Sequence, residues 1–148
     1  MSELIFRQSI EITAPASKVW AVLTKPELAK QFMFGFEPVT DWKVGSKIDW
    51  KGVIKGKEII AVTGKVLTFE PEKLIQYSVF DPQNPDLKDI PSNYTTVTER
   101  LTVKGDTVLL EVSQGDFAPV QGGQTRYEHT VAGWGAVIPV IKDLAEKA

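Results

Sequence analysis

The stretch from Gln124 to Lys147 most constrains the fold, because it carries the only long helical pattern in the chain. At about 3.6 residues per turn, its apolar residues share one stripe, and polar or small residues occupy the opposite side. The stripe comprises Tyr127, Val131, Trp134, Ile138, Ile141 and Ala145, flanked by Val137 and Leu144. Such a stripe must be buried against other elements, so it predicts one long helix packed on a sheet.

Three residues within this stretch oppose a regular helix: Gly133, Gly135 and Pro139. Proline lacks a backbone donor and clashes with the preceding turn, which kinks or breaks a helix. Pro139 lies on the polar side, however, where the freed carbonyl can reach water. The two glycines lower the helix propensity further. We therefore expect one bent helix, with Pro139 as the place where it would break.

The remainder of the chain is mostly strand-like, with alternating or continuous apolar runs bounded by turn residues. These runs predict six strands, at about residues 4–13, 46–53, 58–69, 74–81, 94–103 and 107–114. Pro15 and Pro26 each stand where a short helix can begin after the first strand. Because consecutive strands joined by short turns favour antiparallel pairing, we predict an α+β fold. A curved antiparallel sheet of about six strands would wrap around the long C-terminal helix.

Length and composition favour a single domain over residues 1–148. The formal net charge of −2 argues against binding to nucleic acid or to anionic membranes, which requires concentrated positive charge. The absence of cysteine excludes disulfides and thiolate metal sites. The sequence has neither an apolar run of about 18 residues nor an N-terminal signal pattern. We expect a cytoplasmic protein without a metal or cofactor.

Two loops are candidates for the edge of a binding site. Residues 32–36 read Phe-Met-Phe-Gly-Phe, and a loop this apolar must cover a core, line a pocket mouth or meet a partner. The segment from Pro82 to Asn93 is long, polar and contains three prolines, which makes it a candidate lid. Asp81, just before this segment, is expected to be solvated.

Four groups of local motifs follow one another along the chain. The first two are Ile10-Glu11-Ile12-Thr13-Ala14-Pro15-Ala16 with Val19-Trp20 and Leu23-Thr24-Lys25-Pro26, and Gly64-Lys65-Val66 with Glu70-Pro71 and Leu74. The others are Thr95 to Thr98 with Gly105 and Thr107, and Gly133-Trp134 with Leu144. In this order the motifs resemble the helix-grip fold of the START/Bet v 1 superfamily, and within it the activator of Hsp90 ATPase family in its single-domain form. The family often has a tryptophan where this chain has Phe32.

The resemblance implies a cavity between the curved sheet and the long helix, and binding of a small hydrophobic ligand there. For the named relatives it also implies contact with the chaperone Hsp90, and some distant members of the superfamily are cyclases or hydratases. Pockets of this kind are lined mostly by apolar side chains. The aromatic candidates are Trp20, Trp50, Tyr77, Tyr94 and Trp134, together with Phe32 and Phe34 of the apolar loop.

Two charged residues are candidates for a polar contact inside this cavity. Glu99 shares the strand parity of Val97 and Leu101, so its carboxyl is expected to point inward. A buried carboxylate needs a partner or takes up a proton, and Arg126 at the edge of the helix stripe is a plausible partner. Such a pair could orient a ligand or act as acid and base. The alternative is a bulge that turns Glu99 outward. The lone His129 is expected to be an exposed helical residue.

Three functions therefore remain open. The first, which we favour, is non-enzymatic binding of a hydrophobic ligand. The second is a protein-interaction module that contacts a chaperone, and the third is an enzyme that uses Glu99 and Arg126. The sequence does not decide between an open cavity and an interior filled by Trp50, Tyr77 and Trp134.

Overall fold

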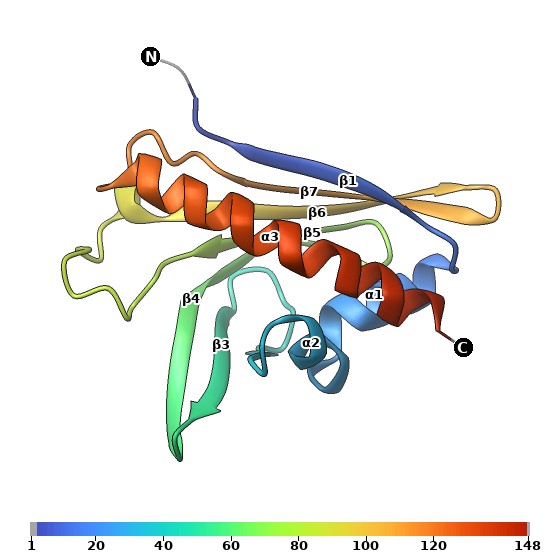
Figure 1. The fold of residues 1–148 in the computed structure, drawn as a ribbon, viewed down its shortest axis with the longest axis horizontal. Helices are drawn as coiled ribbons and strands as arrows, with labels where there is room; N and C mark the ends of the chain where they lie inside the picture. The colour runs from blue at the N-terminus through green and yellow to red at the C-terminus, as the bar shows by residue number, and fades with distance from the viewer. Residues whose placement is uncertain (1–2, 148) are drawn as a thin grey trace.

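A computed structural model, which describes residues 3–147, shows one antiparallel sheet with helices on one face (Figure 1). The strand order across the sheet is β1-β7-β6-β5-β4-β3-β2. The strands are β1 (Phe6–Ile12), β2 (Glu37–Val39), β3 (Lys47–Ile54), β4 (Lys57–Glu70), β5 (Leu74–Val79), β6 (Thr95–Lys104) and β7 (Thr107–Gly115). The helices are α1 (Ala16–Thr24), α2 (Pro26–Phe32), the short 3₁₀ turn η1 (Pro91–Asn93) and α3 (Gly123–Glu146).

This architecture confirms the predicted helix-grip class and adds one short strand. The sheet has seven strands, because β2 pairs with β3 at the sheet edge. The sequence predicts a loop here because β2 contains Pro38, which cannot donate to a ladder. An edge strand tolerates proline, since one side of it needs no partner.

Helix α3 runs without interruption through Pro139, so the predicted break does not occur. Pro139 and Gly135 are both exposed, and the carbonyl that the proline leaves unpaired can therefore be solvated. The predicted apolar stripe is confirmed most clearly in the C-terminal half of the helix. The buried members there are Val137, Ile138, Ile141 and Ala145. Val131, in the N-terminal half, is 39% exposed.

The sheet bends sharply within β4, which pairs with β3 over its first part and with β5 over its last part. Gly64 lies at the change of partner, where a Cβ atom would stand 1.7 Å from the carbonyl oxygen of Ser78. Only glycine permits this close approach. The β3–β4 hairpin consequently turns away from the other strands (Figure 1). Its turn uses Lys55 and Gly56 at positive φ, as expected for a tight hairpin.

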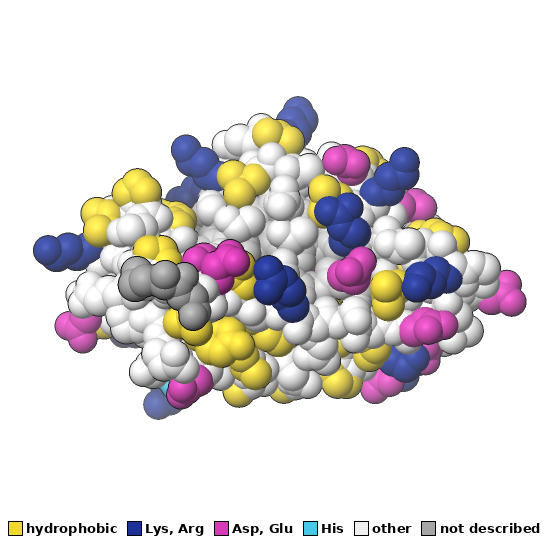
Figure 2. All heavy atoms as spheres, turned by 90° about the horizontal axis from the view of Figure 1, so that it is seen from above, with side chains coloured by type: hydrophobic (Ala, Val, Ile, Leu, Met, Phe, Trp, Pro, Cys, Tyr) yellow, Lys and Arg dark blue, Asp and Glu magenta, His cyan; other side chains and the backbone are white. Residues whose placement is uncertain are grey.

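The core fills the space between the concave face of the sheet and the helices. Inward residues of β6 alternate with outward ones, so Val97, Glu99 and Leu101 are buried. A second, smaller cluster lies where α3 begins and consists of Phe80, Leu87, Phe117 and Val120. Among residues 3–147, no helix is both long and apolar enough to cross a membrane. On the face seen in Figure 2, basic and acidic side chains are interspersed, which does not concentrate positive charge.

Candidate functional site

A pocket of about 250 Å³ lies between the concave face of the sheet and the N-terminal half of α3. We refer to it as the α3 pocket. The sheet and the residues next to it contribute Trp50, Ala61, Val62, Tyr77, Val79, Asp81, Val97 and Gln114. Helix α3 contributes Arg126, Thr130, Gly133, Trp134 and Val137, and the apolar loop contributes Met33 and Phe34. The lining is thus mainly apolar, with a few polar groups.

The space exists in part because α3 presents Gly133, which has no side chain, at this level. Gly133 faces the pocket, and a Cβ atom placed there would meet no atom within 4 Å. Further along the same helix, Ile138 and Ile141 are fully buried and fill the corresponding volume. The sequence predicts the apolar stripe of the helix, but not that the interface with the sheet is filled along one half of the helix and leaves a pocket along the other.

Two hydrogen-bond donors in the wall of the α3 pocket have no partner within the part of the chain that the structure describes. They are the indole Nε1 of Trp50 and the guanidinium Nε of Arg126, and both atoms are buried. By contrast, Trp134 Nε1 donates to Gln114 Oε1 at 2.9 Å, and Gln114 Nε2 donates to Thr95 Oγ1 at 3.1 Å. The amide of Gln114 is therefore already paired at both ends, whereas Trp50 and Arg126 retain free donors.

Two further ionisable groups lie on the same face of the sheet. Burial raises the pKa of the Glu99 carboxyl from its ordinary value of 4.5 to about 8. Burial, and then the charge of Glu99, raise the pKa of the Tyr77 hydroxyl well above its ordinary value. The nearby Trp50 indole opposes that rise in the pKa of Tyr77, although its Nε1 completes no hydrogen bond with the hydroxyl. At neutral pH both groups are therefore mostly protonated and uncharged.

The predicted inward orientation of Glu99 is confirmed, but its predicted pairing with Arg126 is wrong. An Nη of Arg126 lies 3.4 Å from Asp81 Oδ2, and desolvation alone accounts for the raised pKa of Glu99. Asp81 follows the end of β5 and comes within reach of α3, a juxtaposition that loop composition does not reveal. The prediction that Asp81 is merely solvated is therefore corrected. Glu99 lies on the sheet but is not part of the pocket lining.

Three of the predicted aromatic residues lie outside the pocket lining. Trp20 packs against Phe69, with ring centroids 5.3 Å apart. Phe32 is buried and meets Trp50 edge-on at 6.4 Å, so it supports the pocket wall from behind. Tyr94 stacks on Phe80 in the smaller cluster and donates a hydrogen bond to Asp89. Phe34, Trp50, Tyr77, Trp134 and Arg126 do line the pocket.

The two candidate loops behave differently. Met33 and Phe34 reach the pocket, and the Phe34 side chain is 73% exposed. The segment 82–93 contributes no lining residue, because it is anchored elsewhere. Leu87 is buried in the smaller cluster, and Asn93 bonds both the Lys88 carbonyl and the Gln121 amide. The expectation that this segment closes the cavity is therefore not supported.

Sequence reasoning missed Asp81, Gln114, Thr130 and Gly133. Gln114 had a readable signal, since it shares the inward parity of Leu110 and Val112 in a strand that is otherwise apolar on that side. An inward glutamine at a strand end indicates a polar contact inside the cavity. His129 is exposed, as predicted.

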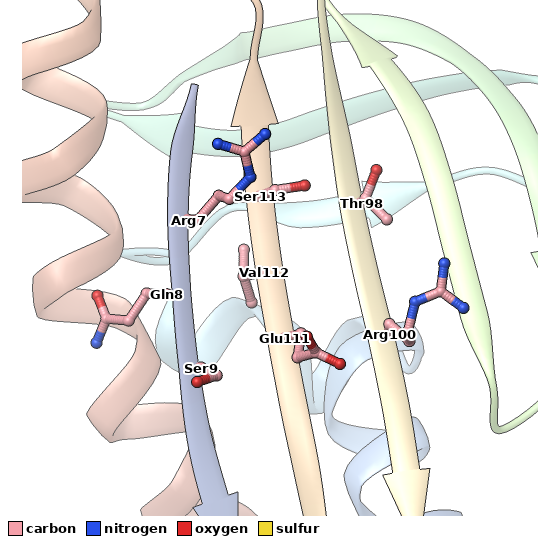
Figure 3. Close-up of a pocket in the computed structure, with 8 residues that line it drawn as sticks. All are labelled: Arg7, Gln8, Ser9, Thr98, Arg100, Glu111, Val112 and Ser113. Atoms are coloured by element: carbon pink, nitrogen blue, oxygen red, sulfur yellow. The ribbon is translucent and has the colours of Figure 1, made fainter. Parts of the chain in front are cut away.

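A second hollow lies on the opposite, outer face of the sheet, across β1, β7 and β6 (Figure 3). Arg7, Glu111 and Arg100 project from these three adjacent strands. The cross-strand register places Arg100 opposite Glu111, so side chains of opposite charge stand on neighbouring strands there. This open, polar surface is a weaker candidate for a binding site than the α3 pocket, which is apolar and holds unpaired donors.

Comparison with known proteins shows related sequences and folds. A family model described as "Activator of Hsp90 ATPase homolog 1-like protein" matches residues 13–146. ChR145 from Cytophaga hutchinsonii is 36% identical, with a TM-score of 0.76 over 96% of this chain and 94% of that chain. MLL2253 from Mesorhizobium loti is 21% identical, with a TM-score of 0.75 over 95% of each chain. No match was found among curated proteins.

A third structure, the Aha1 dimer from Colwellia psychrerythraea, has a TM-score of 0.71 at 17% identity, covering 96% of each chain. At 17% and 21% identity, the Colwellia and Mesorhizobium structures share the fold, and nothing about their sites is transferred from them. The 36% identity to the Cytophaga protein, over nearly the full length of both chains, indicates a closer relationship.

Proposed function

Since the chain belongs to the activator of Hsp90 ATPase homolog 1-like family, in which a sheet packs on a long helix, we propose that it binds a small apolar molecule in the α3 pocket. The observation that carries this proposal is the pocket itself, with its apolar lining and few convergent polar groups. Pockets for drug-sized ligands have volumes of about 300–1,000 Å³. A volume of about 250 Å³ therefore favours a smaller molecule.

Binding without chemistry agrees best with the arrangement of ionisable groups. Acid–base catalysis needs an acid and a base within hydrogen-bond reach of the reacting atoms. Arg126 is held by Asp81, and Glu99 lies outside the pocket lining. Because Glu99 and Arg126 are not paired, the enzymatic alternative lacks its proposed acid and base, and we propose a binding protein.

A matched pair of glycine variants tests this proposal. Gly133 lines the pocket, whereas Gly135 is exposed on the same helix, and a Cβ atom added at either position would meet no atom within 4 Å. Gly133→Leu should fill the pocket, and Gly135→Leu should leave it open. The probe is isopentylbenzene, and the readout is tryptophan fluorescence.

We expect saturable binding of isopentylbenzene to the natural protein and to Gly135→Leu. In Gly133→Leu the dissociation constant should rise at least about tenfold, because the side chain occupies the volume of the ligand. Circular dichroism provides the folding control for both variants. Equal affinity of the two variants for isopentylbenzene would mean that the probe binds outside the α3 pocket, which would contradict the proposal.

The family description also motivates a second candidate function, contact with Hsp90. The structure offers exposed apolar side chains for such a contact, notably Phe34 and Val53, which are 73% and 71% exposed. Purified Hsp90 should then be retained by the immobilised protein and lost with Phe34→Ser. Retention that is insensitive to changes at Phe34 and Val53 would exclude this surface.

A further inference from the structure

We propose that the ligand of the α3 pocket carries a neutral carbonyl oxygen, which accepts hydrogen bonds from the indole of Trp50 and the guanidinium of Arg126. This inference rests on the proposed function and specifies the chemistry of the bound molecule. It follows from which hydrogen-bonding groups in the pocket wall are free and which are already paired.

Trp50 provides the strongest observation. Its side chain is almost entirely buried, with an exposed fraction of 4%, and it lines the pocket. Its Nε1 has no hydrogen-bond partner within residues 3–147. Two other indoles are satisfied by the chain itself, since Trp134 donates to Gln114 and Trp42 donates to the Thr24 carbonyl. Buried donors are nearly always paired. The Tyr77 hydroxyl lies close enough for the Trp50 indole to affect its pKa, but Nε1 completes no hydrogen bond with it, so an acceptor on a ligand would satisfy this donor.

Arg126 supplies a second free donor in the same wall. Its Nε is buried without a partner in the described part of the chain, and its Asp81 contact is a single, long one of 3.4 Å through one Nη. A guanidinium has five N–H donors and no acceptor, so the buried Nε–H of Arg126 is a donor left without an acceptor. The free groups at Trp50 and Arg126 are therefore donors only. The complementary atom on a ligand must be an acceptor.

The surrounding charges favour a neutral acceptor over an anion. Asp81 already offsets the charge of Arg126, and a ligand carboxylate would have to compete with it. Glu99 lies buried on the same face of the sheet, and a buried anion carries a large desolvation cost. A carbonyl satisfies the donors without adding charge. The hydrocarbon part of the ligand would contact Val97, Trp134 and Val137.

Three probes of nearly the same shape test this inference. They are 4-phenylbutan-2-one with a carbonyl, 3-phenylpropanoate with a carboxylate, and isopentylbenzene with no acceptor. Dissociation constants are measured at pH 7 by tryptophan fluorescence. The ketone should bind at least about tenfold more tightly than either other probe, because the hydrocarbon leaves buried donors unpaired.

An NMR measurement on the natural protein tests the role of Trp50 without a substitution in the core. In ¹H–¹⁵N spectra, the Trp50 indole proton should move downfield with the ketone and not with isopentylbenzene. The Trp42 indole, bonded to Thr24, serves as the internal control. In Trp50→Phe, if folded, the advantage of the ketone should fall to about threefold or less, since only Arg126 remains as a donor.

The outcomes separate this inference from the proposed function. If the ketone and the hydrocarbon bind with equal affinity, and Gly133→Leu binds neither, the ligand does not need a carbonyl group. That result would overturn this inference and leave the proposed apolar binding pocket standing. Tightest binding of 3-phenylpropanoate would replace the neutral acceptor with an anion and also overturn the inference. Failure of all three probes to bind would overturn the carbonyl and the proposed function together.

Discussion

The two halves of α3 carry the same apolar stripe but meet different surroundings. In the C-terminal half, Ile138 and Ile141 are fully buried, and α1 lies beside this end of the helix (Figure 1). Lys142 Nζ also donates to the Glu11 carbonyl, which ties this end to β1. In the N-terminal half, Trp134 is only partly buried and Gly133 leaves space above the sheet.

This difference teaches that an amphipathic stripe specifies which side of a helix faces the sheet, but not how completely side chains occupy the space between them. That packing depends on the side chains of the elements opposite the helix. Helices α1 and α2 add a third side to the core at one end, and their residues Val19, Val22 and Leu23 are buried there. At the other end, the smaller cluster of Phe80, Leu87, Phe117 and Val120 packs where α3 begins. Between this cluster and the C-terminal half, the bent sheet, Gly133 and the apolar loop around Phe34 leave a pocket.

The largest expected effect tests the packed half. Ile138→Ala and Ile141→Ala should each lower the free energy of unfolding by about 2–5 kcal/mol, because each leaves a cavity in a fully buried site. Val131→Ala, on the exposed part of the stripe, should change it by less than about 0.5 kcal/mol. Urea denaturation measures all three variants. Similar losses at the three positions would contradict the distinction between the halves.

The next effect concerns the pH dependence contributed by Glu99. Its pKa is about 8 in the folded protein and near 4.5 when exposed, so the folded state keeps a proton that the unfolded chain releases between these values. The stabilisation is complete below pH 4.5 and declines by up to about 1.4 kcal/mol per pH unit as the pH rises toward 8.

Replacing Glu99 by Gln should flatten this decline. Glu99→Gln should make the protein more stable than the natural chain at pH 8, with little difference at pH 5. Glu111→Gln, at an exposed site on the neighbouring strand, is the control and should leave the slope unchanged. Thermal unfolding between pH 5 and 9 provides the test, and parallel curves for Glu99→Gln and the natural protein would count against a protonated carboxyl.

A smaller change in stability is expected from glycine substitutions in the N-terminal half of α3. Gly135→Ala should raise the free energy of unfolding by about 0.5–1 kcal/mol, since alanine favours the helix and its methyl group meets no neighbour. Gly133→Ala should stabilise similarly while narrowing the pocket. Urea denaturation measures both, and a destabilised Gly135→Ala would show that the exposed side of α3 is more constrained than we infer.

The smallest effect is expected at the rim of the α3 pocket. Asp81→Asn removes the charge partner of Arg126 and should cost less than about 1 kcal/mol, because both side chains are partly solvated. Chemical denaturation at low and high salt measures this. A loss comparable to that of Ile138→Ala would mean that the ion pair organises the open half.

The sequence predicts the fold well because the fold depends on local periodicity. Alternation locates the six longer strands, and the 3.6-residue period locates α3. The sequence does not predict the short β2, because Pro38 favours a loop and the pairing of β2 with β3 is not visible in the sequence. The predicted break at Pro139 does not occur, because the carbonyl that loses its partner in the preceding turn is accessible to water.

The candidate site is predicted less completely because it depends on contacts between distant segments. Strand parity places Glu99 inward correctly. The pairing of Arg126 with Asp81 joins residues 45 positions apart, and local periodicity does not reveal a contact across such a separation. Tyr94 is assigned to the cavity from its size, yet it packs in the smaller cluster with Phe80.

The most direct test of the account is a titration with 4-phenylbutan-2-one that follows the four tryptophan indole signals in ¹H–¹⁵N spectra. Trp50 and Trp134 line the α3 pocket, whereas Trp20 and Trp42 pack on Phe69 outside that lining. The account predicts saturable shifts at Trp50 and Trp134, with Trp20 and Trp42 unchanged. Shifts confined to Trp20 and Trp42, or no saturable shift at any indole, would contradict a binding pocket under the N-terminal half of α3.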